Sequence, residues 1–197
     1  MTDAPTLALP AGTSVDRRHV LNLVALLLGA STVMINLALA GSYINLRALA
    51  AEWPPAAIRL DNYHGTTVFL TLLLSSVMAE WGVYAIRRNN TRQATAAFIT
   101  TIGLGAAALN LIWYLGTQLG FGPRDHAYGT TFYAFLIVNG VAVAVAIVFA
   151  LVALLRMLAG QVTARAPELA RAAFWYWQAV VLSWTVAYVT LYFFQNR

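Results

Sequence analysis

Five long apolar stretches dominate the pattern of hydrophobic and polar positions along the chain. Each is long enough to cross the hydrocarbon core of a bilayer, which takes about 20 mostly apolar residues in helical form. A helix is favoured there because it satisfies its own backbone hydrogen bonds in lipid. The pattern predicts an all-α, polytopic membrane protein with five transmembrane helices, at about residues 20–44, 63–86, 94–115, 129–155 and 172–194.

The segments between these stretches are short and polar. After the first stretch comes Trp53-Pro54-Pro55, and proline cannot continue a helix, so a turn at the membrane surface is expected. No connection is large enough to form a soluble domain. We therefore expect one transmembrane domain at residues 19–194, preceded by a tail at residues 1–18 and followed by a short end at residues 195–197.

The arginines predict the orientation of the bundle. Cytoplasmic loops carry an excess of basic residues. One side would hold eight arginines, namely Arg17, Arg18, Arg87, Arg88, Arg92, Arg156, Arg165 and Arg171, and the other side only four, namely Arg47, Arg59, Arg124 and Arg197. The N-terminus is therefore predicted to be cytoplasmic and the C-terminus to lie outside.

The amino-acid composition narrows the possible class of protein further. Hydrophobic residues make up 60% of the chain and charged residues only 10%, whereas soluble domains carry about 25% charged residues. A water-soluble enzyme is excluded on this ground. The net charge of +5 fits basic loops facing anionic lipid. Nucleic acid is not an expected partner, because no basic stretch is interleaved with stacking aromatic residues.

Histidines are too few and badly placed for haem ligation within the chain. Two histidines at matching depth are needed for bis-histidine haem, whereas His19 and His64 are predicted at opposite surfaces. A metal candidate on the outer side is Asp61 with His64 and His126, but the favoured interpretation is a set of solvated residues at helix ends. No cofactor is therefore expected in this chain.

One acid lies inside an apolar stretch. Glu80 is six residues before Ile86, which places it about 9 Å inside the inner boundary of the helix. Buried carboxylates in membranes are candidates for function, so Glu80 could relay protons or bind a buried polar partner. The alternative, which the position favours, is an interfacial glutamate that water reaches or that pairs with Arg87 or Arg88.

Four amide side chains also fall within the predicted spans. Asn36, Asn110, Asn139 and Gln178 are expected to form hydrogen bonds between helices, which is the usual role of amides inside membrane bundles.

Several motifs occur in the order found in a known family. They are Trp53-Pro54-Pro55 after the first helix, Leu70-Thr71-Leu72-Leu73-Leu74-Ser75-Ser76 in the second, Ala127-Tyr128-Gly129-Thr130-Thr131-Phe132-Tyr133 at the start of the fourth, and Trp177, Trp184, Thr190 and Tyr192-Phe193 in the last. With these motifs the chain resembles subunit III of cytochrome c oxidase in its short, five-helix bacterial form.

The chain departs from that family at polar positions. Thr32 stands in the register of a buried glutamate, and Asn139-Gly140-Val141-Ala142 carries neither histidine of the family pattern. Similarly, Gln178 follows Trp177 where the family has histidine. The loss of these groups fits a scaffold and lipid-binding role better than a role in proton handling.

The resemblance implies a non-catalytic component of a haem–copper terminal oxidase in aerobic respiratory electron transport. Its partners would be oxidase subunits I and II or their equivalents, which would hold haem and copper, together with structural phospholipid. A multi-pass protein of a bacterial inner membrane is expected. The alternatives are a stand-alone transporter or channel, a metal-dependent membrane enzyme, and an accessory subunit of a nitric oxide reductase.

Overall fold

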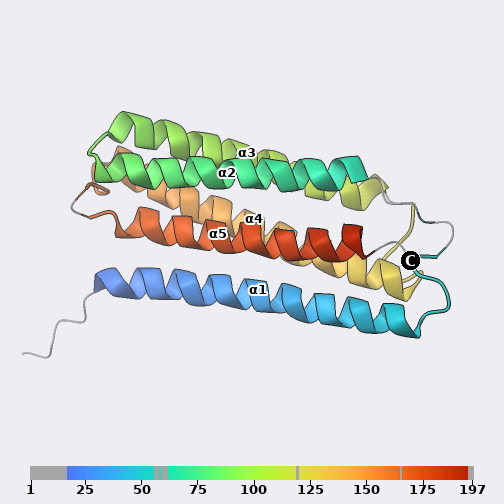
Figure 1. Cartoon of the computed structure of the whole chain (residues 1–197). Helices are drawn as coiled ribbons and strands as arrows, with labels where there is room; N and C mark the ends of the chain where they lie inside the picture. The colour runs from blue at the N-terminus through green and yellow to red at the C-terminus, as the bar shows by residue number, and fades with distance from the viewer. Residues whose placement is uncertain (1–16, 56–57, 59–61, 119, 165, 195–197) are drawn as a thin grey trace, which may run out of the picture.

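A computed structural model describes residues 17–55, 58, 62–118, 120–164 and 166–194. The described residues form long α-helices and no strand, so the predicted all-α class is confirmed. In chain order the elements are α1 at Arg17–Leu49, α2 at Asn62–Arg87, α3 at Thr91–Gln118, α4 at Ala127–Leu158, α5 at Glu168–Tyr188 and a π-helical turn, η1, at Val189–Phe193 (Figure 1).

The helices lie side by side in three layers. α4 and α5 occupy the middle, α1 packs on one side of them, and α2 and α3 pack on the other (Figure 1). α5 contacts α1, α2 and α4, whereas α4 contacts α1, α3 and α5. The two central helices therefore connect the outer layers, and both contribute many buried residues.

Local sequence sets the turns between helices. Asn89 between α2 and α3 adopts a positive φ of 57°, a conformation that asparagine tolerates better than most residues. Asn90 then accepts a hydrogen bond from the backbone N–H of Gln93, as a helix N-cap does. At the other end of the bundle, His126 caps α4 by accepting from the backbone N–H of Gly129.

The first and last helices begin earlier than the sequence pattern predicts. α1 runs from Arg17 to Leu49 instead of residues 20–44, because the residues flanking the apolar stretch continue the helix. α5 begins at Glu168, four residues before the predicted start at residue 172. Its α-helical part ends at Tyr188, and the remainder of the predicted span continues as η1.

Within the described residues, the four helices α1 to α4 are long and apolar enough to cross a membrane. α5 is not among them, although it is flanked by α1, α2 and α4. Its sequence contains tryptophan, tyrosine and glutamine, as well as Glu168 and Arg171 in the first turn. These residues lower its hydropathy, and the neighbouring helices cover many of them. The chain is a multi-pass membrane protein.

Basic residues gather at one end of the bundle. Because consecutive helices run in opposite directions, the arginines at the end of α2, the start of α3, the end of α4 and the start of α5 share the end at which α1 begins (Figure 1). These are Arg87, Arg88, Arg92, Arg156 and Arg171. Assignment of this end to the cytoplasm stays a prediction.

Candidate functional site

A closed ring of hydrogen bonds lies in the centre of the bundle. Asn36 of α1 donates to Ser183 of α5 at 2.6 Å. Ser183 donates to Asn139 of α4 at 3.0 Å, and Asn139 donates back to Asn36 at 2.8 Å. All three residues are fully buried. The ring links the three helices α1, α4 and α5 at one depth.

The backbone also takes part in this ring. The Asn36 amide reaches the carbonyl of Thr32 at 3.2 Å, and the Asn139 amide reaches that of Phe135 at 2.9 Å. Each of the three side chains therefore both donates and accepts a hydrogen bond. The free-energy cost of burying these polar groups is offset by the bonds within the cluster. These groups are used to hold helices together, and the expected interhelical role of Asn36 and Asn139 is confirmed.

A second set of polar contacts joins α2 to α5. The indole N–H of Trp177 donates to the Ser75 hydroxyl at 2.9 Å, and that hydroxyl donates to the carbonyl of Leu72 at 2.7 Å. The neighbouring Ser76 hydroxyl donates to the side-chain carbonyl of Gln178. Trp177 and Trp184 are both buried on α5. The paired serines and the two tryptophans therefore form part of the helix packing.

An aromatic cluster closes the end of the bundle opposite the basic end. Trp53, which precedes Pro54 and Pro55, packs edge-on against Tyr43 at 5.2 Å and against Tyr128 at 5.3 Å between ring centroids. Such edge contacts are a favoured geometry for aromatic pairs. The cluster ties the segment after α1 to the first turn of α4.

Gly129 follows Tyr128 in that first turn and allows a close approach of the chain. A Cβ atom at this position would lie 2.7 Å from the carbonyl oxygen of Gly122. No larger residue fits without a shift of backbone. The sequence motif that contains Tyr128 and Gly129 thus has a packing explanation in this fold.

The three residues of the metal hypothesis are only partly described. Asp61 lies outside the described residues. His126 uses its Nδ1 atom to cap α4, and the ring of His64 packs against Tyr63 and Tyr114 at 5.4 and 5.2 Å between centroids. Within the described part of the chain, no group of three or more metal-binding side chains comes together. The metal hypothesis stays a prediction.

Glu80 lies on the outside of α2 near the basic end. Its side chain is exposed, and it lines a small pocket between α2 and α5 together with Arg87 and Arg171. The carboxylate is therefore not enclosed in the bundle. A proton role for Glu80 stays a prediction.

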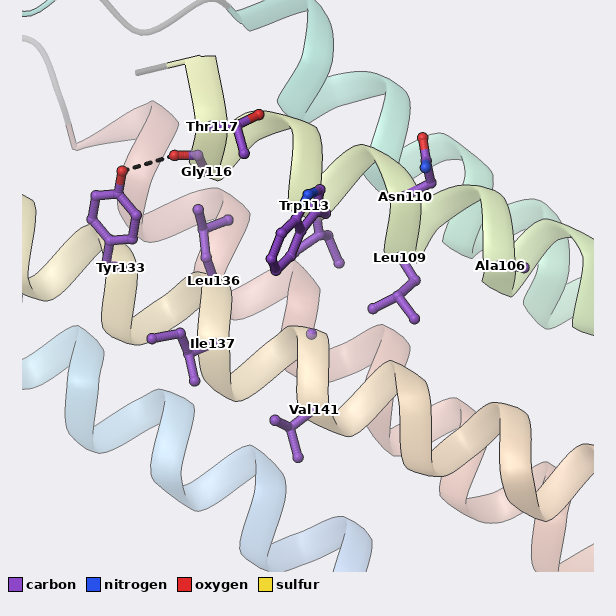
Figure 2. A pocket seen from close by; sticks show the side chains of 12 residues that line it. Ala106, Leu109, Asn110, Trp113, Gly116, Thr117, Tyr133, Leu136, Ile137 and Val141 are labelled. Atoms are coloured by element: carbon purple, nitrogen blue, oxygen red, sulfur yellow. Dashed lines mark hydrogen bonds between the residues drawn. The ribbon is translucent and has the colours of Figure 1, made fainter. Parts of the chain in front are cut away.

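A larger groove lies between α3 and α4, with a volume of about 700 Å³. Figure 2 shows Leu109 and Trp113 of α3 and Ile137 and Val141 of α4 along it. Its lining residues carry no charge. Trp113 is 76% exposed, so its ring stands at the open side. This surface is suited to holding hydrocarbon.

Tyr133 and Asn110 are polar residues that line the groove. Tyr133 donates to the carbonyl oxygens of Gly116 and Phe121 at 2.8 and 3.0 Å and joins the end of α3 to α4 (Figure 2). Asn110 is exposed on α3 among the lining residues. The expectation of an interhelical bond is wrong for Asn110, because the register of α3 leaves its side chain exposed and outside the core.

Sequence reasoning missed Ser183 and Arg171 as site residues. A serine in an apolar stretch gives no local sign of a partner far away in the chain. The predicted start at residue 172 leaves Arg171 just outside the last helix, whereas α5 begins at Glu168 and includes Arg171, which lies beside α2. The sequence of residues 166–168, considered as a helix start, is the signal that could have placed Arg171 on the helix.

Known proteins give consistent matches. A family model described as "Cytochrome c oxidase subunit III" matches residues 17–196. Among curated relatives, "Cytochrome c oxidase subunit 3" of Spodoptera frugiperda is 31% identical over 146 residues, which cover 73% of this chain and 99% of that protein. The proteins of the same name from Drosophila yakuba and Petromyzon marinus are 33% and 32% identical over 146 and 148 residues.

The extent of these matches differs between relatives. Each covers 73% of this chain, but only 56% of the Drosophila yakuba and Petromyzon marinus proteins. The matched part of the chain therefore corresponds to about half the length of those relatives.

Proposed function

Because the chain belongs to the cytochrome c oxidase subunit III family, we propose that it is a non-catalytic subunit of a haem–copper terminal oxidase. In this proposal it packs against oxidase subunits I and II or their equivalents, which hold haem and copper. It stabilises the complex and binds phospholipid. Respiratory electron transport then passes through the partner subunits.

The closed ring of Asn36, Asn139 and Ser183 is the observation that carries the non-catalytic role. Its side-chain amides and hydroxyl are satisfied by one another or by nearby carbonyls. Polar groups used in this way give a rigid core. Such a core favours a packing module over a proton path through the centre of the bundle.

The outer surface supports assembly into a complex. In its most apolar window α1 is only 22% buried, compared with 39% for α2 and α4. Side chains such as Leu27, Met34 and Leu37 are more than half exposed. Lipid or a neighbouring transmembrane helix would cover this face. The groove between α3 and α4 supports phospholipid binding, because acyl chains are the apolar molecules that surround it in a bilayer.

Orientation and location form part of the same proposal. We place the basic end of the bundle at the cytoplasmic face of a bacterial inner membrane, with residues 1–18 on that side and residues 195–197 outside. The transmembrane domain then spans residues 19–194. The excess of arginines at one end supports this placement.

Removal of the chain tests the stabilising role. We expect oxidase prepared from a deletion strain to retain haem in its catalytic subunits but to unfold at a lower temperature than oxidase with the chain, because a bound subunit stabilises the folded complex by mass action. Thermal unfolding of both preparations, followed by the haem absorbance, gives the comparison. Equal midpoints for the two preparations would contradict a stabilising role.

A further inference from the structure

Asn110 of α3 is a polar side chain on the outer surface of the bundle, at a depth that lies within the bilayer. α3 has 28 residues, which corresponds to a length of about 40 Å, compared with about 30 Å for the hydrocarbon core of a bilayer. Asn110 lies about 12 Å before the end of α3 at Gln118. If α3 is centred in the bilayer, Asn110 is therefore about 7 Å inside the hydrocarbon.

The amide of Asn110 needs a hydrogen-bond partner from outside the chain. Its side chain is exposed and makes no hydrogen bond with any residue in the described part of the chain. Hydrocarbon offers neither a donor nor an acceptor, so an unpaired amide in it costs free energy. Amides inside membranes are usually satisfied by another helix, as Asn36 and Asn139 are within this bundle. We therefore expect a polar group on a helix of another chain to meet Asn110.

The face of α3 that carries Asn110 permits such a helix to approach closely. Ala107 lies one turn before Asn110 and Gly103 lies two turns before it, and both are exposed. A Cβ atom built on Gly103 would have no other atom within 4 Å. Residues 100–112 are all described, and none of their large apolar side chains is exposed. Small residues in this arrangement allow the backbones of two membrane helices to come into contact.

The outward faces of α1 and α2 differ from this face of α3. They carry long apolar side chains that are at least half exposed, among them Leu27, Met34, Leu70, Leu74 and Val77. Side chains of this kind are suited to contact with acyl chains and need no polar partner. The face with Gly103, Ala107 and Asn110, here called the α3 face, is therefore the part of these outward surfaces that favours close contact with a helix.

A second copy of this chain presents the matching surface. In a parallel pair with a two-fold axis along the membrane normal, each residue of α3 near the axis meets its own equivalent at the same depth. A carboxamide carries both donors and an acceptor, so two Asn110 side chains can bond to each other. Gly103 and Ala107 would then face their equivalents. We propose that two copies of this chain associate in the membrane through the α3 face, with the two Asn110 amides hydrogen-bonded to each other.

The layers of the bundle leave room for both this contact and an oxidase partner. α3 belongs to one outer layer and α1 to the opposite one (Figure 1). Pairing through α3 therefore leaves the exposed face of α1 free. The association goes beyond the proposed oxidase role and does not depend on it. In an oxidase it would join two complexes through their copies of this chain.

Disulfide cross-linking in native membranes tests which face meets a second copy. The chain contains no cysteine, so a single introduced cysteine reports on one position. Ala107→Cys should give a disulfide-linked homodimer on mild oxidation, because a disulfide joins Cα atoms about 4.4–6.8 Å apart. Met34→Cys is the matched control and should not cross-link. Met34 is exposed on α1, and both residues lie about 25 Å from the start of their helices at the basic end.

Two results of the cross-linking would overturn the proposal. The first is the absence of a homodimer from Ala107→Cys, which is the result expected if a helix of a different subunit covers the α3 face. The second is an equal yield of homodimer from Ala107→Cys and Met34→Cys, which random collision in the membrane would give. Absence of haem-containing subunits from the membranes would leave the homodimer unchanged, so this test is separate from that of the oxidase role.

The dissociation constant of the full chain, measured by sedimentation in density-matched detergent, tests the role of the amide. Asn110→Leu should weaken the association about tenfold, because the reciprocal hydrogen bonds are lost. Gly41→Leu is the control, since Gly41 is exposed on α1 and has no atom within 4 Å of a Cβ. It should leave the constant unchanged. An equal constant for Asn110→Leu and the unmodified chain would contradict pairing through Asn110.

Gly103→Leu tests the close approach of the two helices. A leucine on each copy would hold the two α3 helices apart, so the association should weaken more than tenfold. Neither Gly103 nor Asn110 packs against another part of the chain, so the dilute, monomeric variants should fold as the unmodified chain does. Circular dichroism of the dilute chains verifies this. A folded Gly103→Leu chain that still associates with the original constant would overturn the proposed contact.

Discussion

Replacement of Asn139 by leucine should destabilise the bundle by about 2 kcal/mol. Leucine has the same branched shape and the same number of heavy atoms but removes the donor to Asn36 and the acceptor for Ser183. Ser183 can turn to a carbonyl of its own helix, but the Asn36 carbonyl oxygen loses its donor in a fully buried position. An unpaired buried group costs about 1–3 kcal/mol. This cost exceeds the contribution of about 0.6 kcal/mol that one hydrogen bond makes on average inside a membrane bundle.

The free energy of unfolding of the purified chain, measured by titration with sodium dodecyl sulfate in mixed micelles, checks this value. Asn110→Leu is the matched control, because that amide is exposed, and it should unfold as the unmodified chain does. The triple change Asn36→Leu, Ser183→Ala and Asn139→Leu should recover part of the loss, because no polar group is then left unpaired. An unaltered unfolding curve for Asn139→Leu would show that the ring contributes nothing to stability.

Replacement of Gly105 by leucine should have a similar or larger effect, about 2–3 kcal/mol. A Cβ atom on Gly105 would lie 2.6 Å from the Trp177 ring and 3.2 Å from Ile147. Trp177 is buried and fixed by its bond to Ser75, so the ring cannot easily move aside. Overpacking of this kind costs about 1–3 kcal/mol, and α3 must shift away from the central layer.

Gly103 offers a control two residues away on the same helix. No atom lies within 4 Å of a Cβ built at Gly103, so Gly103→Leu should be neutral or slightly stabilising, since leucine has the higher helix propensity. The same detergent titration compares the two variants. Equal stability of Gly103→Leu and Gly105→Leu would contradict the close approach of α3 to Trp177.

The helices could be predicted from the sequence because apolar length alone specifies a membrane-spanning helix. All five helices lie where the hydropathy pattern placed them, with ends that differ by a few residues. Helix ends depend on caps and turns. The His126 cap at α4 and the start of α5 at Glu168 were not read from the pattern for this reason.

The sequence indicates which buried side chains form hydrogen bonds between helices, but it does not identify their partners. Amides inside apolar stretches indicate interhelical bonds, which holds for Asn36, Asn139 and Gln178. It fails for Asn110, since hydropathy does not fix which face of α3 turns inward. The pocket with Glu80 and Arg171 required the packing of α5 against α2, and their separation in sequence gives no indication of it.

The central claim is that this chain is a subunit of a complex whose redox groups lie in other subunits. Purification of the tagged chain from native membranes in mild detergent, with an optical spectrum of the product, tests it most directly. We expect larger subunits to accompany the chain at fixed stoichiometry and to give a haem spectrum. A chain that emerges alone and colourless from membranes containing active oxidase would contradict the account.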